Sequence, residues 1–139
     1  MATDKVEFEL VSPERLLVSE QVDMVVVPGA DGDFGVLPRH APLISTLRPG
    51  VIRIFEGRTV KERIFVAGGF AEVTPERCTV LAEEAVPFEQ VTPDQLADRE
   101  RAAEIELSDA STDAEKAAAQ KNLAVARDLR RAQTYYASR

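Results

Sequence analysis

The side chains that could carry catalysis are few, and they stand apart from one another. His40 is the only histidine and Cys78 the only cysteine of the chain. One cysteine excludes an intramolecular disulfide and any cysteine-based zinc site. No arrangement of serine, cysteine or aspartate that could supply a nucleophile and its base surrounds His40 in the sequence. We therefore expect His40 to be structural or to contact a partner; an independent enzyme that uses His40 is the alternative.

A glycine-rich segment at residues 29–35 superficially resembles a phosphate-binding or calcium-binding loop. It lacks the lysine and hydroxyl residue that end a phosphate loop, and no helical pattern follows it. It also lacks the glutamate that closes a calcium loop at the proper spacing. We interpret the segment as a wide turn whose glycines permit positive φ.

Two pairs of charged residues in the last third of the chain have helical spacing. Asp98 and Arg101 are three residues apart, which predicts an exposed ion pair on one helix face. Arg127 and Arg131 are four apart and share a face, where two like charges oppose the helix slightly. An acidic partner or a phosphate would relieve that repulsion. The alternative is that these cations only favour the negative end of the helix dipole.

Composition narrows the class of protein that must position these residues. The chain has 139 residues, 17 basic and 24 acidic, and a net charge of −7. This balance argues against nucleic acid as a partner, because phosphate binding needs a basic stripe. No apolar run approaches the ~20 residues that span a bilayer, and the acidic start fits neither a secretory signal nor a transit peptide. A soluble bacterial protein or a peripheral subunit is predicted.

The chain divides into two halves of different composition. All seven glycines lie at or before Gly69 and no proline follows Pro93, whereas alanine is frequent in the tail. We place the boundary within residues 87–92. This predicts a β-domain at residues 1–88 and a helical domain at residues 89–139.

The first half has the pattern of short strands joined by tight turns. Apolar and acidic residues alternate at 6–10, and an apolar run at 24–27 ends in Pro-Gly. Gly68-Gly69 suits a bulge or a tight strand connection. Strands of this length and spacing predict a sandwich or a barrel. Two hairpins are expected, from strands 51–55 with 64–66 and from strands 71–73 with 79–82.

The second half predicts two helices joined by about four residues, which form an antiparallel hairpin. The first is expected from Thr92 to about Leu107 and the second from Thr112 to about Tyr136. Each threonine is followed three residues later by Gln or Glu, the spacing of a capping box.

The expected contact between the helices is poor in large side chains, so the hairpin is a plausible moving part. Helix one offers Leu96, Ala103 and Leu107. The predicted seam of helix two consists of Ala118, Asn122, Val125, Leu129, Ala132 and Tyr136.

Three segments, in the same order, carry a resemblance to a known family. They are GDFGVLPRHAPLISTLRPGVIRI at residues 32–54, VAGGFAEV at 66–73 and TVLA at 79–82. The first is similar to the G-x-x-G-x-x-P-x-H-A-P-L segment, and the P-G-x-x-x-I strand after it, of the epsilon subunit of the bacterial F-type ATP synthase. The other two resemble the same family's small-Gly-Gly-hydrophobic-x-E-V segment and its T-V-L-A strand. The likeness covers essentially the whole chain.

The resemblance implies a ten-stranded β-sandwich followed by a two-helix hairpin. It also implies a non-catalytic subunit of the rotor's central stalk, at the cytoplasmic face of the bacterial inner membrane. There the sandwich would bind the gamma subunit and rest on the polar loops of the c-ring. An extended hairpin would reach the alpha and beta subunits and restrain ATP hydrolysis. The resemblance implies no required cofactor and no metal.

Two sets of site residues follow from the same resemblance. Asp33 stands where the family has an acidic residue near the c-ring loops, and Arg39 and His40 belong to the same loop. Basic c-ring loops would attract the acid at Asp33, so alanine at this position is expected to weaken coupling between head and ring.

Some members of the family bind ATP in the folded hairpin through an Ile/Leu-Asp-x-x-Arg-Ala motif. This chain keeps Asp98, Arg101 and Ala102 of that motif but has alanine in place of the aliphatic residue. Arg127 and Arg131 would face the phosphates. ATP is therefore the one ligand that the resemblance suggests, and a nucleotide-sensing module is the alternative to a stalk subunit.

Overall fold

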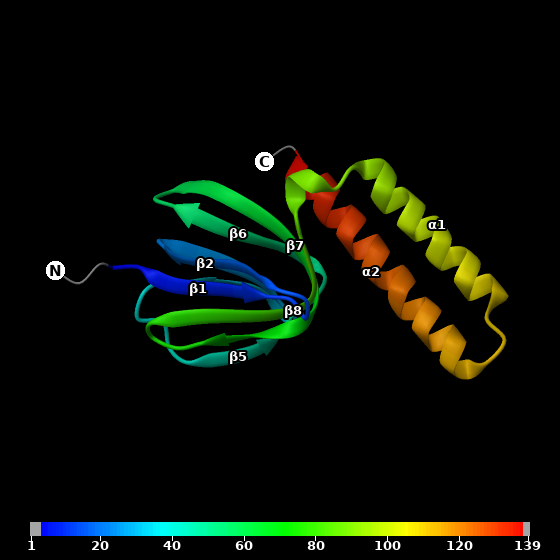
Figure 1. Cartoon of the computed structure of the whole chain (residues 1–139), viewed down its shortest axis with the longest axis horizontal. Helices are drawn as coiled ribbons and strands as arrows, with labels where there is room; N and C mark the ends of the chain where they lie inside the picture. The colour runs from blue at the N-terminus through cyan, green and yellow to red at the C-terminus, as the bar shows by residue number, and fades with distance from the viewer. Residues whose placement is uncertain (1–3, 138–139) are drawn as a thin grey trace. The chain divides into compact units, whose positions relative to one another are not determined.

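The computed structural model describes residues 4–137, which belong to two compact units (Figure 1). The first unit is Met1–Phe88 and the second is Glu89–Arg139. Within residues 4–137, no helix has the length and apolar character that crossing a membrane requires.

The first unit is a sheet of eight strands, counted over the described residues. Its order is β2-β1-β8-β7-β6-β3-β4, and β5 also pairs with β7. Neighbouring strands are antiparallel except β1 and β8, which run parallel. The strands are β1 (Val6–Val11), β2 (Leu16–Val22), β3 (Met24–Gly29), β4 (Gly32–Val36), β5 (Leu43–Thr46), β6 (Gly50–Glu56), β7 (Thr59–Val73) and β8 (Arg77–Pro87).

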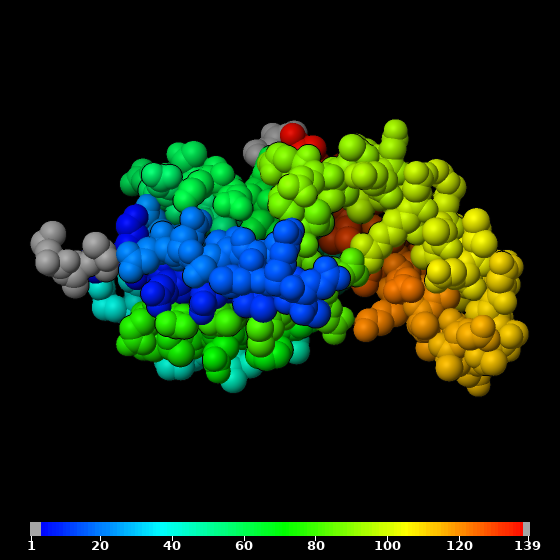
Figure 2. Space-filling view, in the orientation of Figure 1, coloured from blue at the N-terminus to red at the C-terminus, as the bar shows by residue number. Residues whose placement is uncertain are grey.

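The sheet folds over one apolar core, which makes it a β-sandwich. The alternation expected at the start of the chain is confirmed, because Val6, Phe8 and Leu10 of β1 are at most 1% exposed. Their side chains join a cluster with residues of β3, β4, β6, β7 and β8. β2 closes one end of the strand order and lies at the surface of the face seen in Figure 2.

The expected number of ten strands is wrong for the described residues, which hold eight. The segments expected as separate strands at 64–66 and 71–73 belong to one 15-residue strand, β7. The first part of β7 pairs with β6 and the last part with β5. A long strand that takes part in both layers replaces two short ones, which lowers the count without changing the architecture.

Gly68 and Gly69 allow this long strand to bend. Their φ angles are 73° and 97°, in the left-handed region that side chains with a Cβ rarely adopt. A Cβ on Gly69 would stand 1.8 Å from the carbonyl oxygen of Leu81 on β8. The feature expected here as a bulge or a connection is therefore a bend within a continuous strand.

The turns between strands are tighter than expected at one place and as expected at two. Both predicted hairpins are confirmed, with Glu56 opposite Thr59 in β6–β7 and Val73 opposite Cys78 in β7–β8. The segment at residues 29–35 is not a wide turn. Gly29 pairs with Gly32, so β3 and β4 join through a two-residue hairpin loop.

The second unit begins with a 3-10 turn at its border, η1 (Phe88–Gln90), and contains helices α1 (Pro93–Asp109) and α2 (Asp113–Ala137). Both predicted capping boxes are confirmed. The hydroxyl of Thr92 accepts from the Gln95 amide at 3.2 Å, and the Gln95 side chain accepts from the Thr92 amide at 2.8 Å. Thr112 opens α2 in the same way.

The predicted seam of α2 is confirmed at Leu129 and wrong by one residue at the other buried positions. The helix buries Ala119, Leu123, Ala126, Leu129 and Gln133, whereas Ala118 and Asn122 are exposed. Burying Leu123 removes more apolar area from water than burying Asn122 would, which favours the observed register. On α1, Leu96 and Ala103 are buried as expected.

Candidate functional site

The polar side chains that lie between the two helices of the hairpin form its candidate site. Arg127, Arg130 and Arg131 lie in the second half of α2 and Glu100 in the first half of α1. The capping boxes fix where each helix starts and therefore which residues face across.

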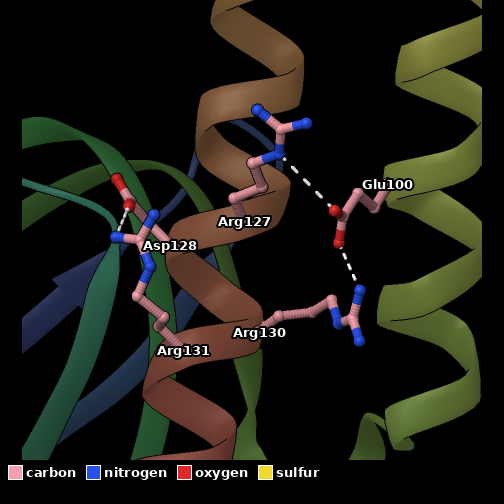
Figure 3. A network of polar contacts seen from close by, with 5 residues as sticks. All are labelled: Glu100, Arg127, Asp128, Arg130 and Arg131. Atoms are coloured by element: carbon pink, nitrogen blue, oxygen red, sulfur yellow. Dashed lines mark hydrogen bonds and ion pairs between the residues drawn. The ribbon is translucent and has the colours of Figure 1, made fainter.

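Glu100 is the residue that links α1 to α2 (Figure 3). One carboxylate oxygen accepts from Nε of Arg127 at 3.5 Å, and the other makes a shorter contact with a guanidinium nitrogen of Arg130. The Glu100 side chain is only 17% exposed. Its contact with Arg130, and to a lesser extent that with Arg127, lowers the pKa of Glu100 below its ordinary value of 4.5, so the carboxylate is charged at neutral pH.

An open hollow of about 520 Å³ lies beside this contact. Its lining includes Glu100, Arg127, Arg130, Arg131, Thr134 and Tyr135. Two of its guanidinium groups, those of Arg127 and Arg130, contact the Glu100 carboxylate, and Arg131 pairs with Asp128 (Figure 3). Three arginines against two carboxylates make the hollow electropositive. Such a site favours an anion of the size of a phosphate group.

The structure divides the residues expected to bind ATP into two groups. Arg127 and Arg131 both line the hollow. Arg131 also pairs with Asp128 at 2.8 Å on its own helix. Asp98 and Arg101 instead pair with each other on α1, where both side chains are 68% exposed.

Ala102 is exposed on α1 and, like Asp98 and Arg101, is not among the residues that line the hollow. The three motif residues and the arginine pair are therefore not brought together here. A nucleotide that touched both groups would have to span the distance between them.

Two residues of the site were missed by the sequence reasoning, Glu100 and Arg130. Glu100 lies four residues after Leu96 and three before Ala103, both of which are buried. A charged residue at that position of an otherwise apolar stripe is the signal that could have found it. Arg130 stands between Ala126 and Gln133 at the same spacing on α2.

A second polar contact lies at the end of α2. The amide nitrogen of the Gln133 side chain donates to the carbonyl oxygen of Val91 at 2.9 Å, and Gln133 is 8% exposed. A buried amide with its partner in place anchors the end of α2 to the segment that precedes α1.

Asp33 lies in a cluster of charged side chains on the sandwich. Asp33 pairs with Arg48, which also donates to the Gly29 carbonyl at 2.6 Å. Arg53 lies 3.9 Å from the other carboxylate oxygen. Asp33 is thus the centre of a small cluster with two cations, and its charge is balanced within the chain.

Arg39 and His40 lie beyond the opposite end of β4 from Asp33. Arg39 has a φ of 66°, unusual for a residue with a side chain, and its amide donates to the Pro75 carbonyl at 2.8 Å. Its guanidinium pairs with Asp4 at 2.6 Å. His40 is partly buried, with Nδ1 2.6 Å from the Ala41 carbonyl oxygen. Asp33 and Arg39 therefore hold separate parts of the surface.

Cys78 has no role in a site. It is buried in β8, and burial raises the pKa of its thiol to about 12. The reactive thiolate is therefore absent at neutral pH.

Comparison with known proteins defines the class of the sandwich and then the family of the chain. Residues 5–88 match the family described as ATP synthase, Delta/Epsilon chain, beta-sandwich domain. An ATP synthase epsilon chain of Rhodospirillum rubrum is 59% identical over 123 residues, which are 88% of this chain and 92% of that protein. One of Parvibaculum lavamentivorans is 50% identical over 128 residues, 91% of this chain and 96% of that protein. The chain belongs to the family of ATP synthase epsilon chains.

Solved structures agree with this fold. A chain in the Euglena gracilis mitochondrial ATP synthase, OSCP/F1/c-ring, has a TM-score of 0.77 at 24% identity and covers 94% of this chain and 82% of its own length. A chain of the Tetrahymena thermophila mitochondrial ATP synthase, central stalk/c-ring, has a TM-score of 0.64 at 17% identity, with 96% and 99% covered. Epsilon chains are non-catalytic subunits of ATP synthases, so by its family this chain is one such subunit and not the part that catalyses the reaction.

Proposed function

We propose that the sandwich of this stalk subunit binds the gamma subunit and the polar loops of the c-ring. The helical hairpin regulates ATP hydrolysis by opening toward the alpha and beta subunits. The chain thereby couples the catalytic head to the ring, at the cytoplasmic face of the bacterial inner membrane, and is held to the membrane through the complex alone.

The observation that carries this proposal is the length of the similarity to epsilon chains. The match of 123 residues at 59% identity is longer than the 88-residue sandwich unit, so it extends into the hairpin. The relative therefore shares both parts, and a role that needs both is supported.

The packing of the hairpin supports movement. Half of the six apolar side chains buried between its helices are alanines, which contribute little buried area: Leu96, Ala103, Ala119, Leu123, Ala126 and Leu129. A closed state with little apolar area differs by only a few kcal/mol from an open one, so a partner that binds the open state can shift the population.

Nucleotide sensing is the second candidate function, and the electropositive hollow favours it. Arg127 and Arg131 line that hollow and could face phosphates. ATP bound to the closed hairpin would bias it away from the open state, by no more than its differential affinity for the two states. Asp98, Arg101 and Ala102 would have to supply contacts to the rest of the nucleotide.

ATP hydrolysis by a core of alpha, beta and gamma subunits tests the main proposal. The core is combined with the full chain or with a chain that ends at Gln90, and binding is recorded with the rate. We expect both to bind and only the full chain to slow hydrolysis. Equal rates with both bound would remove the regulatory role of the hairpin. Failure of both to bind would overturn the contact with gamma.

Asp33 tests the contact of the sandwich with the ring. Asp33→Ala leaves Arg48 and Arg53 without the carboxylate that orients them, so we expect the assembled complex to hydrolyse ATP with less proton pumping per ATP. Asp31→Ala, at an exposed residue in the loop that precedes β4, is the matched control. Equal pumping by the two variants would remove Asp33 from the contact.

A further inference from the structure

The two helices of the closed hairpin are held together by a small apolar contact and by ion pairs. Its apolar contact is small, yet a carboxylate from α1 and two guanidinium groups from α2 meet across it (Figure 3). Other ion pairs of the hairpin, Asp98 with Arg101 and Asp128 with Arg131, lie within one helix and cannot hold two helices together.

Glu100 makes the contact that a phosphate group would make. Each of its two oxygens accepts from a different arginine, Arg127 or Arg130, and its side chain is largely withdrawn from solvent. Carboxylate and phosphate oxygens present the same kind of acceptor to a guanidinium group. The two guanidinium groups would repel each other if no anion lay between them.

The hollow next to Glu100 has room for a larger anion. Arg131, Thr134 and Tyr135 complete its lining on the side of α2. An external phosphate could approach through this opening, but Glu100 already occupies the contact with Arg130. Both anions cannot neutralise the same guanidinium equally well, so they compete.

We propose that Glu100 is a built-in counterion that takes the place of an external phosphate between Arg127 and Arg130. The hairpin of this chain closes without a bound nucleotide, and a phosphate-bearing ligand binds there only by displacing Glu100. One consequence is that closure of this hairpin responds weakly to nucleotide, and this consequence rests on the proposed function. The contact itself is a property of the isolated chain.

Hydrogen exchange in the full-length chain tests whether Glu100 holds the hairpin closed. Glu100→Gln keeps the helix and the shape of the side chain but removes the charge. We expect amides of α1 and α2 that face the interface to exchange about threefold to tenfold faster in this variant. Glu104→Gln removes the same charge from an exposed position one turn later on α1 and should exchange like the unaltered chain. Equal exchange in the two variants would overturn the proposal.

Anion binding tests whether Glu100 stands in for phosphate. Inorganic tripolyphosphate and ATP are titrated into the unaltered chain, Glu100→Gln and Glu104→Gln. We expect Glu100→Gln alone to bind tripolyphosphate about tenfold more tightly and to regain slow exchange when the anion is bound. Faster exchange without tighter anion binding would leave Glu100 as an ordinary helix contact and would overturn its role as a counterion.

A third variant separates this mechanism from unfolding of the hairpin. Arg130→Gln removes the other side of the contact, so exchange should again rise, but anions should not slow it. If Glu100→Gln binds ATP more tightly than tripolyphosphate, the counterion role is supported, and the nucleoside makes a further contact with the chain. None of these measurements uses the other subunits. Failure of the stalk assignment would be seen as no binding to the alpha, beta and gamma core. It is therefore distinguishable from failure of the counterion proposal, which is tested on the isolated chain.

Discussion

Among the glycines of the sandwich, Gly69 has the least room for a side chain. Its φ of 97° is disfavoured with a side chain, and a Cβ would lie 1.8 Å from the Leu81 carbonyl oxygen and 2.8 Å from the Leu81 carbonyl carbon. The obstacle is backbone, which cannot swing aside. We expect Gly69→Ala to lower the free energy of unfolding of the sandwich by about 3 kcal/mol or more, measured by urea denaturation.

Gly57 provides the control for this prediction, because it also has a positive φ, 63°, but has no heavy atom within 4 Å of a built Cβ. Gly57→Ala should cost only the backbone strain of the left-handed conformation, about 1 kcal/mol. Equal losses in the two variants would mean that the clash with Leu81 is relieved by movement of β8.

At the scale of the elements, the start of α2 is tied to pH. The side chain of Thr112, and then that of Ser111, lowers the pKa of Glu115 below its ordinary value of 4.5. A lowered pKa means that the folded state binds the ionised form better. The stabilisation is therefore present above pH 4.5 and is lost as the pH falls through the lowered value. Glu100 acts in the same direction.

The measurement is helix content by circular dichroism as the pH is lowered from 7 to about 2, the range in which carboxylates titrate. Glu115→Gln keeps the acceptor for the Thr112 amide but cannot titrate, so we expect it to lose less helix in acid than the unaltered chain. Glu104→Gln, at an exposed site without a cap, should titrate like the unaltered chain. Identical acid curves for all three would mean that the cap does not contribute to the pH dependence.

At the scale of the whole molecule, the two units are expected to unfold separately because each has its own buried apolar side chains. The core cluster lies wholly within the sandwich. A chain that ends at Gln90 keeps the stack of Phe65 on Phe88, with 4.9 Å between ring centres, and the Arg63 guanidinium 4.2 Å from the Phe88 ring. We expect its sandwich to melt within about 4 °C of the full chain, the shift that ~1 kcal/mol produces in a domain of this size.

Cys78 reports this unfolding directly. It is fully buried and its thiol pKa is about 12, so a disulfide reagent at pH 8 should label it only when the sandwich opens. Labelling rates should match in the full and shortened chains. Much faster labelling of the shortened chain would mean that the hairpin stabilises the sandwich.

The sequence alone determined the features that depend on neighbours along the chain. Alternation at residues 6–10, both hairpins of β6–β8 and both capping boxes are local patterns, and each has a short-range physical cause. The three segments that resemble the epsilon family, in the same order, also identified the family, because a sequence motif is recognised without knowing the structure.

The tertiary structure decided the features that depend on which residues meet across space. It merged two expected strands into β7, because the bend at Gly68 and Gly69 becomes visible only against β8. It moved the seam of α2 by one residue at every buried position except Leu129, because the gain from burying Leu123 depends on the opposing helix. It also placed Glu100 between Arg127 and Arg130, which are 27 and 30 residues away along the chain. Which charges pair across such a separation depends on how the two helices pack, so the spacing of residues along the sequence does not predict the pair.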